Sequence, residues 1–343
     1  MKIFGQQLGP RAVMRRCSAA ELDEPGSAWN RAAARTVQAD PFCCGTQWQL
    51  SFHEVFCPSR PLHLCEGAGS VIAFSEELDP RLGPVLEPVE AGWLFGCPLL
   101  GPNAVHLLDL FLRKELAAER KLPCVLVSGV LPGGQLARSL VQVCRTRFEV
   151  GVAEGARLCS ASLEGGLDGF LSRRSGRLRR NLKSAARKAS QSGVHYERCA
   201  PASAGEADAV YARMVAVEQK SWKGLGRCGM AEMPSKEFYA RMLRRLAVSR
   251  DGRVMFARCG EQDVGFIFGG LAGGVYRGQQ FSYAEDWSGL GIGNLLQVEK
   301  VRWLAEEGVV RYDMGPAMEY KRHWTEVETR IEAWLLRPVW GVG

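Results

Sequence analysis

The sequence has no residue pattern that is typical of a metal site, a disulfide framework or a membrane span. Its twelve cysteines include no C-x-x-C pair, and its five histidines form no H-x-x-x-H pattern. We therefore expect no metal site. No apolar run approaches the ~20 residues that cross a bilayer, and residues 1–10 lack the apolar core of about 7–15 residues of a signal peptide. We expect a cytoplasmic protein with reduced thiols and no transmembrane segment.

The net positive charge of the chain comes from one segment. The 44 Lys and Arg residues exceed the 37 Asp and Glu residues by a formal charge of +7. Eight basic residues and no acidic ones lie between Arg173 and Lys188. Subtracting these eight charges from +7 leaves −1 for the rest of the chain. This distribution indicates one local patch that faces an anion or water, rather than a protein that is basic throughout.

Length and composition are those of a globular protein with about two domains. The chain has 343 residues, 46% of them hydrophobic and 24% charged, which argues against disordered, collagen-like and coiled-coil classes. Strands alternate with helices in the first half, which predicts an α/β fold. We expect strands at Leu62–Cys65, Ser70–Phe74, Trp93–Cys97, Cys124–Ser128 and within Phe148–Leu163, and helices at Ala28–Val37, Ala104–Arg120 and Gln135–Arg145.

The second half begins with the basic segment, which has helical periodicity. Apolar residues from Phe170 to Ala189 fall on one face and cations on another, and Gly193 ends the predicted helix. Ser235 is expected to cap a later helix. Further helices are predicted at Glu206–Trp222 and Leu295–Glu307, and strands at Arg253–Cys259, Val264–Leu271, Val275–Tyr283, Val309–Met314 and Thr329–Leu336.

The predicted strands at Arg253–Cys259, Val264–Leu271 and Val275–Tyr283 form an antiparallel meander. A glycine-rich loop lies between the last of these strands and the next helix. Gly289, Gly291 and Gly293 let backbone N–H groups converge on an anion at a helix N-terminus. The natural ligand is a phosphate or a pyrophosphate. The spacing differs from the Rossmann G-x-G-x-x-G, and no Gly-Lys-Ser/Thr follows as in a P-loop. A flexible connection without a ligand is the alternative.

The order meander, glycine loop, helix and then a strand with Asp313 resembles the GNAT superfamily of acyl-CoA N-acyltransferases. In that superfamily the loop holds the pyrophosphate of CoA. The superfamily usually has Gln or Arg three residues before a Gly-x-Gly/Ala, whereas here Ser288 precedes Gly291 and Asp286 precedes Gly289 at that distance.

Motifs spread over most of the chain resemble one branch of this superfamily, the CelD-like acyltransferases, which are related to the FemABX aminoacyl transferases. These motifs are Trp29, Pro41-Phe42, Gln47-Trp48, Arg177 to Lys183, Glu218, Ser221 to Gly224, Tyr312 to Gly315, Tyr320-Lys321 and Trp324. The resemblance implies an α/β (α+β) fold of two tandem GNAT-like domains, residues 1–163 and 164–343. Each would be a mixed, largely antiparallel sheet flanked by helices.

The resemblance also implies transfer of an acyl group from acyl-CoA, acetyl-CoA first of all, to an amine on a small molecule, a sugar or a peptide. Such chemistry needs a polarised carbonyl, a deprotonated amine and a protonated leaving group. Backbone N–H groups of the strand at Val275–Tyr283 are expected to polarise the carbonyl. The candidate residues are Glu218, Tyr283 and Asp313 for catalysis, Ser288, Gly289, Gly291, Gly293 and Asn294 for CoA, and Trp222, Lys223, Tyr320, Lys321 and Trp324 for substrate.

Structural roles compete with these assignments. Glu218 also suits a solvated helix face, Asp313 a turn, Tyr283 and the tryptophans packing, and Lys321 an exposed position. The basic segment suits a solvated face, the phosphates of CoA or of a tRNA acceptor arm, or an anionic lipid or polysaccharide. An aminoacyl-tRNA-dependent transferase and a non-catalytic GNAT-like binding module are the alternative functions, with tRNA the less favoured partner. A homodimer is a further prediction.

Overall fold

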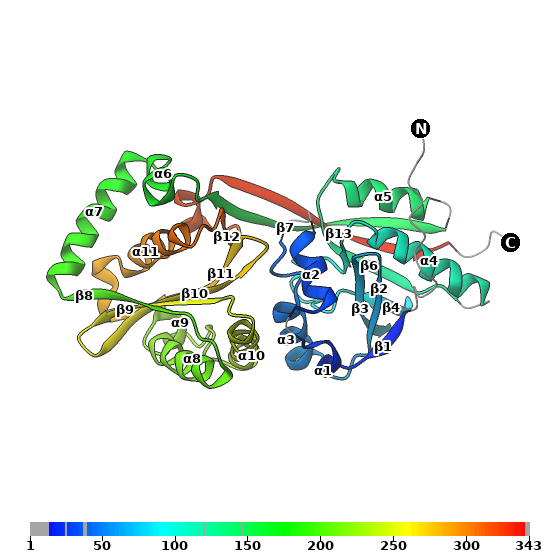
Figure 1. The fold of residues 1–343 in the computed structure, drawn as a ribbon, viewed down its shortest axis with the longest axis horizontal. Coiled ribbons are helices and arrows are strands. Elements are labelled where there is room, and N and C mark those ends of the chain that lie inside the picture. Colours follow the sequence, from blue (N-terminus) through cyan, green and yellow to red (C-terminus); the bar gives the residue numbers. More distant parts are fainter. Residues whose placement is uncertain (1–13, 25, 37–39, 119–120, 146, 340–343) are drawn as a thin grey trace. The chain divides into compact units, whose positions relative to one another are not determined.

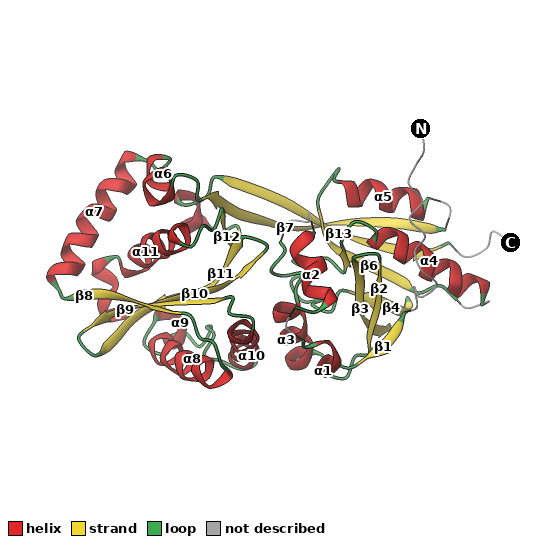
Figure 2. Cartoon of the chain, in the orientation of Figure 1, coloured by secondary structure: helices red, strands yellow, loops and turns green. Residues whose placement is uncertain are grey.

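The chain forms two compact α/β units. The computed structural model describes residues 14–24, 26–36, 40–118, 121–145 and 147–339 (Figure 1). Residues 1–10, in which we expect no signal peptide, lie outside them. Unit 1 comprises residues 1–156 and 330–343, and unit 2 comprises residues 157–329. Both units combine helices with a sheet of mixed strand direction (Figure 2), which confirms the predicted fold class.

Unit 1 is a mixed sheet with helices packed on it. Its strands follow the order β1-β2-β3-β4-β6-β13, with β7 beside β13 and β5 paired to β3. Its strands are β1 (Arg15–Cys17), β2 (Leu62–Gly67), β3 (Ser70–Asp79), β4 (Gly83–Glu87), β5 (Leu99–Leu100), β6 (Cys124–Val130) and parts of β7 (Phe148–Ser162) and β13 (Val327–Pro338). Its helices are α1 (Ala19–Leu22), α2 (Ala28–Arg35), α3 (Thr46–Phe56), α4 (Ala104–Ala117) and α5 (Gln135–Cys144).

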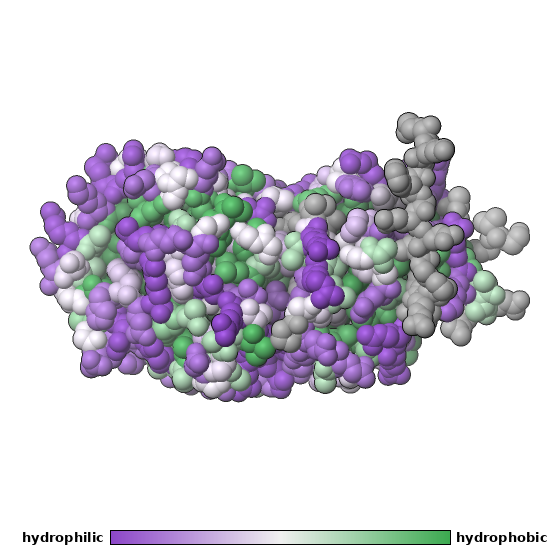
Figure 3. Space-filling view, in the orientation of Figure 1, coloured by the Kyte–Doolittle hydropathy of each residue, from purple (hydrophilic) through white to green (hydrophobic). Residues whose placement is uncertain are grey.

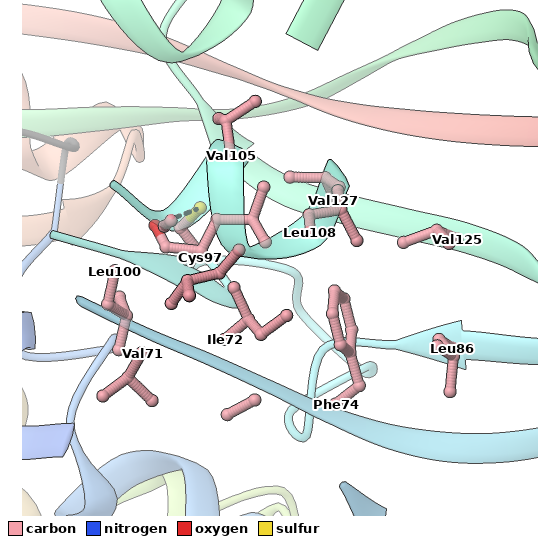
Figure 4. Close-up of a cluster of buried hydrophobic side chains, with 14 of the residues drawn as sticks. Val71, Ile72, Phe74, Leu86, Cys97, Leu100, Val105, Leu108, Val125 and Val127 are labelled. Carbon is pink, nitrogen blue, oxygen red and sulfur yellow. Dashed lines mark hydrogen bonds between the residues drawn. The ribbon is translucent and has the colours of Figure 1, made fainter. Parts of the chain in front are cut away.

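The core of unit 1 lies between the sheet and helix α4. Figure 4 shows Phe74 of β3, Val127 of β6 and Leu108 of α4 pointing toward one another. All three side chains have no exposed surface. The hairpin of β2 and β3 and the helices α2, α4 and α5 are where hydrophobic periodicity predicts them, because each buries one apolar face in this core.

The predicted strand at Trp93–Cys97 is wrong. This segment is a loop that wraps around the buried carboxylate of Glu90. The Oε1 atom of Glu90 accepts from the backbone N–H groups of Trp93 and of Leu94 (3.2 Å), and its Oε2 accepts from that of Phe95 (3.3 Å) and from Nε1 of Trp48 (3.1 Å). These N–H groups are therefore turned toward one side chain instead of a neighbouring strand.

Unit 2 has one sheet with helices on both faces. Its strands follow the order β7-β12-β11-β10-β9-β8, and Figure 1 places α6, α7 and α11 on one face and α8, α9 and α10 on the other. The helices are α6 (Gly166–Ser172), α7 (Gly176–Gln191), α8 (Ala204–Glu218), α9 (Trp222–Leu225), α10 (Ser235–Val248) and α11 (Ile292–Glu306). The strands are β8 (Val194–Cys199), β9 (Gly252–Cys259), β10 (Gln262–Ala272), β11 (Val275–Tyr283) and β12 (Arg311–Pro316), with 3₁₀ turns η1 (Glu285–Leu290) and η2 (Glu319–His323).

The predicted helix from Phe170 to Ala189 is divided between two helices, and the basic residues begin at the break between them. Helix α6 ends before Arg173, and Ser175 caps α7 by accepting from the backbone N–H of Leu178 at 3.2 Å. Arg173 and Arg174 lie at the break, and both pair with Glu326. The predicted cap at Ser235 is also wrong, because Ser235 is the first residue of α10 and its side chain makes no capping hydrogen bond.

The chain passes from one unit to the other within two strands. Strand β7 begins in unit 1 and ends in unit 2, whereas β13 begins in unit 2 and ends in unit 1. The predicted division between residues 163 and 164 therefore differs from the structure, in which residues 330–343 belong to the first unit. Among the helices of the described residues, none is long and apolar enough to cross a membrane.

Replacing Glu90 with Gln should destabilise unit 1 by about 3 kcal/mol. The amide has one acceptor oxygen and presents its NH₂ to N–H donors that the carboxylate satisfies. Urea denaturation followed by tryptophan fluorescence measures the loss. The exposed Glu149→Gln should change the free energy of unfolding by less than about 0.5 kcal/mol. Equal stability of the two variants would contradict the role given to Glu90.

Candidate functional site

Strands β11 and β12 pair at one end and separate at the other. Their parallel ladder joins only Val275–Arg277 to residues 311–313, although β11 continues to Tyr283. At the last paired position, Nη1 of Arg277 lies 2.6 Å from Oδ1 of Asp313. Both side chains are buried, and Asp313 also accepts from the backbone N–H of Gly315 at 2.8 Å. The ion pair therefore fixes the point at which the strands separate.

A second buried cation lies close to this ion pair. Lys321 donates from Nζ to the carbonyl of Pro316 at 2.7 Å. Burial, reinforced by the charge of Arg277, lowers the pKa of Lys321 from about 10.5 to about 8. The side chain is only 8% exposed, so Lys321 is not the surface lysine that its residue type favours.

The part of β11 that does not pair with β12 contains a bulge. Its register with β10 shifts so that Gln280 faces Phe268 and Gly278 faces Gly269, which leaves Gln279 as the extra residue. The Nε2 atom of Gln279 is buried and has no hydrogen-bond partner within the described part of the chain. Because a bulge changes the direction of backbone groups, it can aim N–H groups away from the ladder. This is the segment in which the sequence predicts donors for an acyl carbonyl.

The 3₁₀ turn η1 follows β11 and leads into the glycine loop. Gly291 has a left-handed backbone (φ 70°) that favours glycine, and it leads into the first turn of α11. Gly293 lies against the rings of Tyr283 and Phe281, because an added Cβ would be 3.1 Å from each. The loop therefore packs on the end of β11, and Tyr283 forms part of that contact.

A cavity of about 780 Å³ lies between this loop, one flank of α7 and the turn η2. The sequence predicts six of the residues around it: Ser288, Gly289, Gly291, Asn294, Tyr320 and Trp324. Gly293 does not line it. The other polar residues around the cavity are Ser175, Arg177, Asn181, Ser184 and Lys188 of the α7 segment, and His323. The sequence marks that segment by its charge and by the resemblance of Arg177 to Lys183 to a family motif, with phosphate contact as one of three interpretations.

Two aromatic rings line this cavity, and one of them connects it to the edge of β11. The ring of Tyr320 lines the cavity and packs edge-on against Phe281 with a centroid distance of 5.7 Å. Trp324 stacks on Phe170 at 6.1 Å and is 4% exposed, so it serves both the core and the cavity wall. The predicted substrate-binding residues Tyr320 and Trp324 therefore lie together.

Glu218 and Lys223 meet on the other face of the sheet. Glu218 has no exposed surface; its Oε1 accepts from the backbone N–H of Met230 at 3.0 Å, and its Oε2 has no hydrogen-bond partner among the described residues. The interpretation of Glu218 as a residue on a solvated helix face is therefore wrong. Lys223 donates to the carbonyl of Phe281 (2.8 Å) and to Oε1 of Gln280 (3.2 Å). Burial lowers the pKa of Lys223, while the nearby Glu218 carboxylate opposes this shift.

Trp222 does not join this group of residues, since its side chain is 59% exposed. The functional candidates that the sequence does not single out are Arg277 and the glutamines of the β11 bulge. Their positions depend on strand pairing, which no local motif signals. The described residues contain no group of three or more His, Cys, Asp or Glu side chains that could hold a metal ion.

Comparisons with known proteins agree with this architecture. Residues 176–322 match the family model of the acetyltransferase (GNAT) domain. The structure of FemX is similar over 93% of this chain and 96% of its own, with a TM-score of 0.63 and 10% identity. A conserved protein of unknown function from Bacteroides thetaiotaomicron is similar over 94% and 99% (TM-score 0.62, 9% identity). No match was found among the curated proteins.

A third similar structure is the C-terminal domain of a putative lysylphosphatidylglycerol synthetase from Agrobacterium fabrum. It covers 93% of this chain and 92% of its own, with a TM-score of 0.56 and 10% identity. At these identities the structures show a shared fold alone. The predicted superfamily is confirmed, whereas the narrower CelD-like assignment and the GNAT-like character of unit 1 stay predictions.

The stability of the protein should rise with pH above pH 8 because of Lys321. The pKa of Lys321 is about 8 in the folded chain and about 10.5 when exposed, so the unfolded chain binds more protons between these values. Below pH 8 both states are protonated, and the cost of burying the charge is fully present. From pH 8 to pH 10.5, wild type should gain on the order of 3 kcal/mol that Lys321→Met does not gain.

Urea denaturation at about pH 7.5, pH 9 and pH 10 measures this difference. Lys220→Met, at an exposed lysine, is the matched control and should follow the wild-type profile. Parallel profiles for wild type and Lys321→Met would contradict the lowered pKa.

Proposed function

Because residues 176–322 form an acetyltransferase (GNAT) domain, we propose that the chain is an N-acyltransferase that uses acyl-CoA, with acetyl-CoA the first donor to consider. The observation that carries the proposal is the cavity that combines the glycine loop with the cationic flank of α7. It leads through Tyr320 to Phe281 on the unpaired edge of β11. A donor bound there would have its phosphates at one end and its thioester beside the strand.

The phosphates of CoA are proposed to lie over the first turn of α11. The N-terminus of helix α11, which begins after Gly291, favours an anion, and Gly289 leaves open space beside it. Arg177 and Lys188 on the flank of α7 supply charge, and Asn294 adds a polar side chain. Ser288, at the position where the superfamily usually has Gln or Arg, lines the same cavity, so α7 supplies cations that the loop itself lacks.

The transfer step would take place along β11. The amine nitrogen attacks the thioester carbonyl, a C–N bond forms, and the C–S bond breaks. N–H groups at the Gln279 bulge would bind the developing oxyanion. Tyr283 would give its proton to the leaving thiolate, and the proton lost by the amine would pass to Glu218. Asp313 is held by Arg277, so we assign it to positioning the strands rather than to proton transfer.

The acceptor is proposed to bind through its amine near Glu218 and Lys223. The free Oε2 of Glu218 is a buried acceptor without a donor, which suits an ammonium or amine group. The ammonium group of Lys223 donates to Gln280 and to the carbonyl of Phe281, so it holds a cation beside the part of β11 where transfer is proposed. The chemical class of the acceptor is a primary amine on a small molecule, sugar or peptide. Cytoplasmic location and a homodimer stay predictions.

Aminoacyl-tRNA is the second candidate donor. Arg180 and Arg187 are exposed on α7 and line neither of its cavities, so they are available to a larger polyanion. Binding of this kind would weaken steeply as salt increases. The shared fold with FemX is compatible with either donor.

Replacing Gly289 with Glu should weaken CoA binding at least about tenfold, because it puts a carboxylate where the diphosphate is expected. Gly289 has open space around an added Cβ, so the variant should fold. Isothermal titration calorimetry with CoA measures the change. Gly205→Glu, at an equally open glycine on α8, adds the same charge and should bind CoA as wild type does. Equal binding by all three proteins, or transfer from aminoacyl-tRNA without any CoA-dependent turnover, would overturn the acyl-CoA assignment.

Replacing Glu218 with Gln should lower kcat/KM for the amine about 100-fold, because a general base is lost. The amide oxygen can still accept from Met230, and CoA affinity should not change. The assay follows release of CoA by chromatography with acetyl-CoA and a panel of glucosamine, putrescine and a dipeptide. The exposed Glu232→Gln is the matched control. Wild-type rates in Glu218→Gln would remove Glu218 from catalysis, and no turnover by wild type with any amine would favour a binding module.

A further inference from the structure

Helix α7 has four sides with different surroundings. Leu182 and Ala189 are buried beneath it, whereas Arg180 and Arg187 are exposed and line neither cavity. One flank, which includes Arg177 and Lys188, lines the cavity described above. The opposite flank carries Arg179 and Lys183 one turn apart, with Ala186 and Ser190 on the same stripe. A stripe of this kind on the far side of the helix has no part in the proposed donor site.

A second cavity of about 440 Å³ lies under this opposite flank. Its bed is apolar and comes from three helices: Leu167 and Leu171 of α6, Leu182 and Ala189 of α7, and Leu295 and Val298 of α11. Val194 and Tyr196 of β8 also line it. We refer to this cavity as the α6–α7–α11 groove. Its volume is within the range of small-molecule sites.

Positive side chains outnumber negative ones at the groove. Arg302 is held by Glu299, with Nε 3.0 Å from Oε2, so these two neutralise each other. The side chains of Arg179 and Lys183 are exposed, and neither has an ion-pair or hydrogen-bond partner in the described part of the chain. Two cations therefore remain without a counter-charge beside an apolar bed. In Figure 3 hydrophilic side chains crowd the edge of unit 2 where Figure 1 draws α7, with hydrophobic side chains beside them.

We propose that the α6–α7–α11 groove binds a single fatty chain that ends in a phosphate monoester. The chain would lie on the apolar bed, and the phosphate would be held by Arg179 and Lys183. Charge complementarity selects this occupant: two neighbouring cations match a dianionic phosphate, and Arg forms bidentate contacts with phosphate oxygens. The site is distinct from the proposed donor cavity, and it does not depend on acyl-CoA being the donor.

The test uses the full-length protein and dodecyl phosphate, below the concentration at which it forms micelles. Binding measured by calorimetry should be saturable, and affinity should rise roughly threefold to fourfold per methylene from hexyl to dodecyl phosphate. Ala186→Trp, which fills the groove from an exposed helix position, should weaken binding at least about tenfold. Ala212→Trp, at an exposed position of α8, should bind as wild type does.

Charge variants test the headgroup without changing packing. Arg179→Gln with Lys183→Gln should weaken binding at least about tenfold, whereas Arg180→Gln with Arg187→Gln removes equal charge from the same helix and should have little effect. Gly289→Glu should leave dodecyl phosphate binding intact, which separates this site from the donor cavity. The proposal is overturned by absence of saturable binding, by equal losses in the two charge variants, by loss of binding in Gly289→Glu, by inorganic phosphate binding as tightly, or by binding to anionic vesicles only.

Discussion

The ion pair between Arg277 and Asp313 is the contact on which the candidate site depends. It holds β11 and β12 together at the last residues they share, and both strands then continue without pairing to each other. A buried charge pair gives little net stability, since desolvation offsets most of the attraction. Its effect is geometric. The Asp313 carboxylate accepts from the guanidinium of Arg277 and also from the backbone N–H of Gly315, and these directional contacts fix the position of the two strands relative to each other. The free edge of β11, its bulge and the loop after it all follow from that position.

Helix α7 shows how a run of charge along the sequence acquires different meanings in three dimensions. Adjacent residues on a helix point about 100° apart, so cations that are neighbours in the chain face different surroundings. Two pair with Glu326 before the helix begins, two line the cavity at the glycine loop, two lie beside the apolar groove and two face outward. The three interpretations that the sequence leaves open therefore concern different sides of one segment, and each has to be tested residue by residue.

The sequence predicts best those elements that recognisable turn residues bound. Turns separate the strands of the meander β9–β11, and helix α11 lies between the glycine loop and Gly308, so these elements are found where the sequence places them. Helix α3 is not predicted: seven of its eleven residues are buried, among them Gln49, Ser51 and His53, so its polar residues do not mark an exposed face. The loop at Trp93 depends on Glu90, and the break before α7 involves Glu326, more than 150 residues away. Likewise the loop residues of the cavity are recognisable from glycine spacing, whereas the bulge at Gln279 and the free oxygen of Glu218 arise only from tertiary packing.

The double crossing by β7 and β13 sets an order for folding during synthesis. All of unit 2 lies in one continuous stretch, residues 157–329, so every strand of its sheet has left the ribosome before β13 does. Unit 1 is made first, yet the place between β6 and β7 in its sheet stays empty until residues 330–338 arrive. Until then, two strands expose edges that can pair with another chain. The half of the protein that is translated earliest is thus the last to be completed, and its exposure to aggregation lasts as long as the ribosome needs for unit 2.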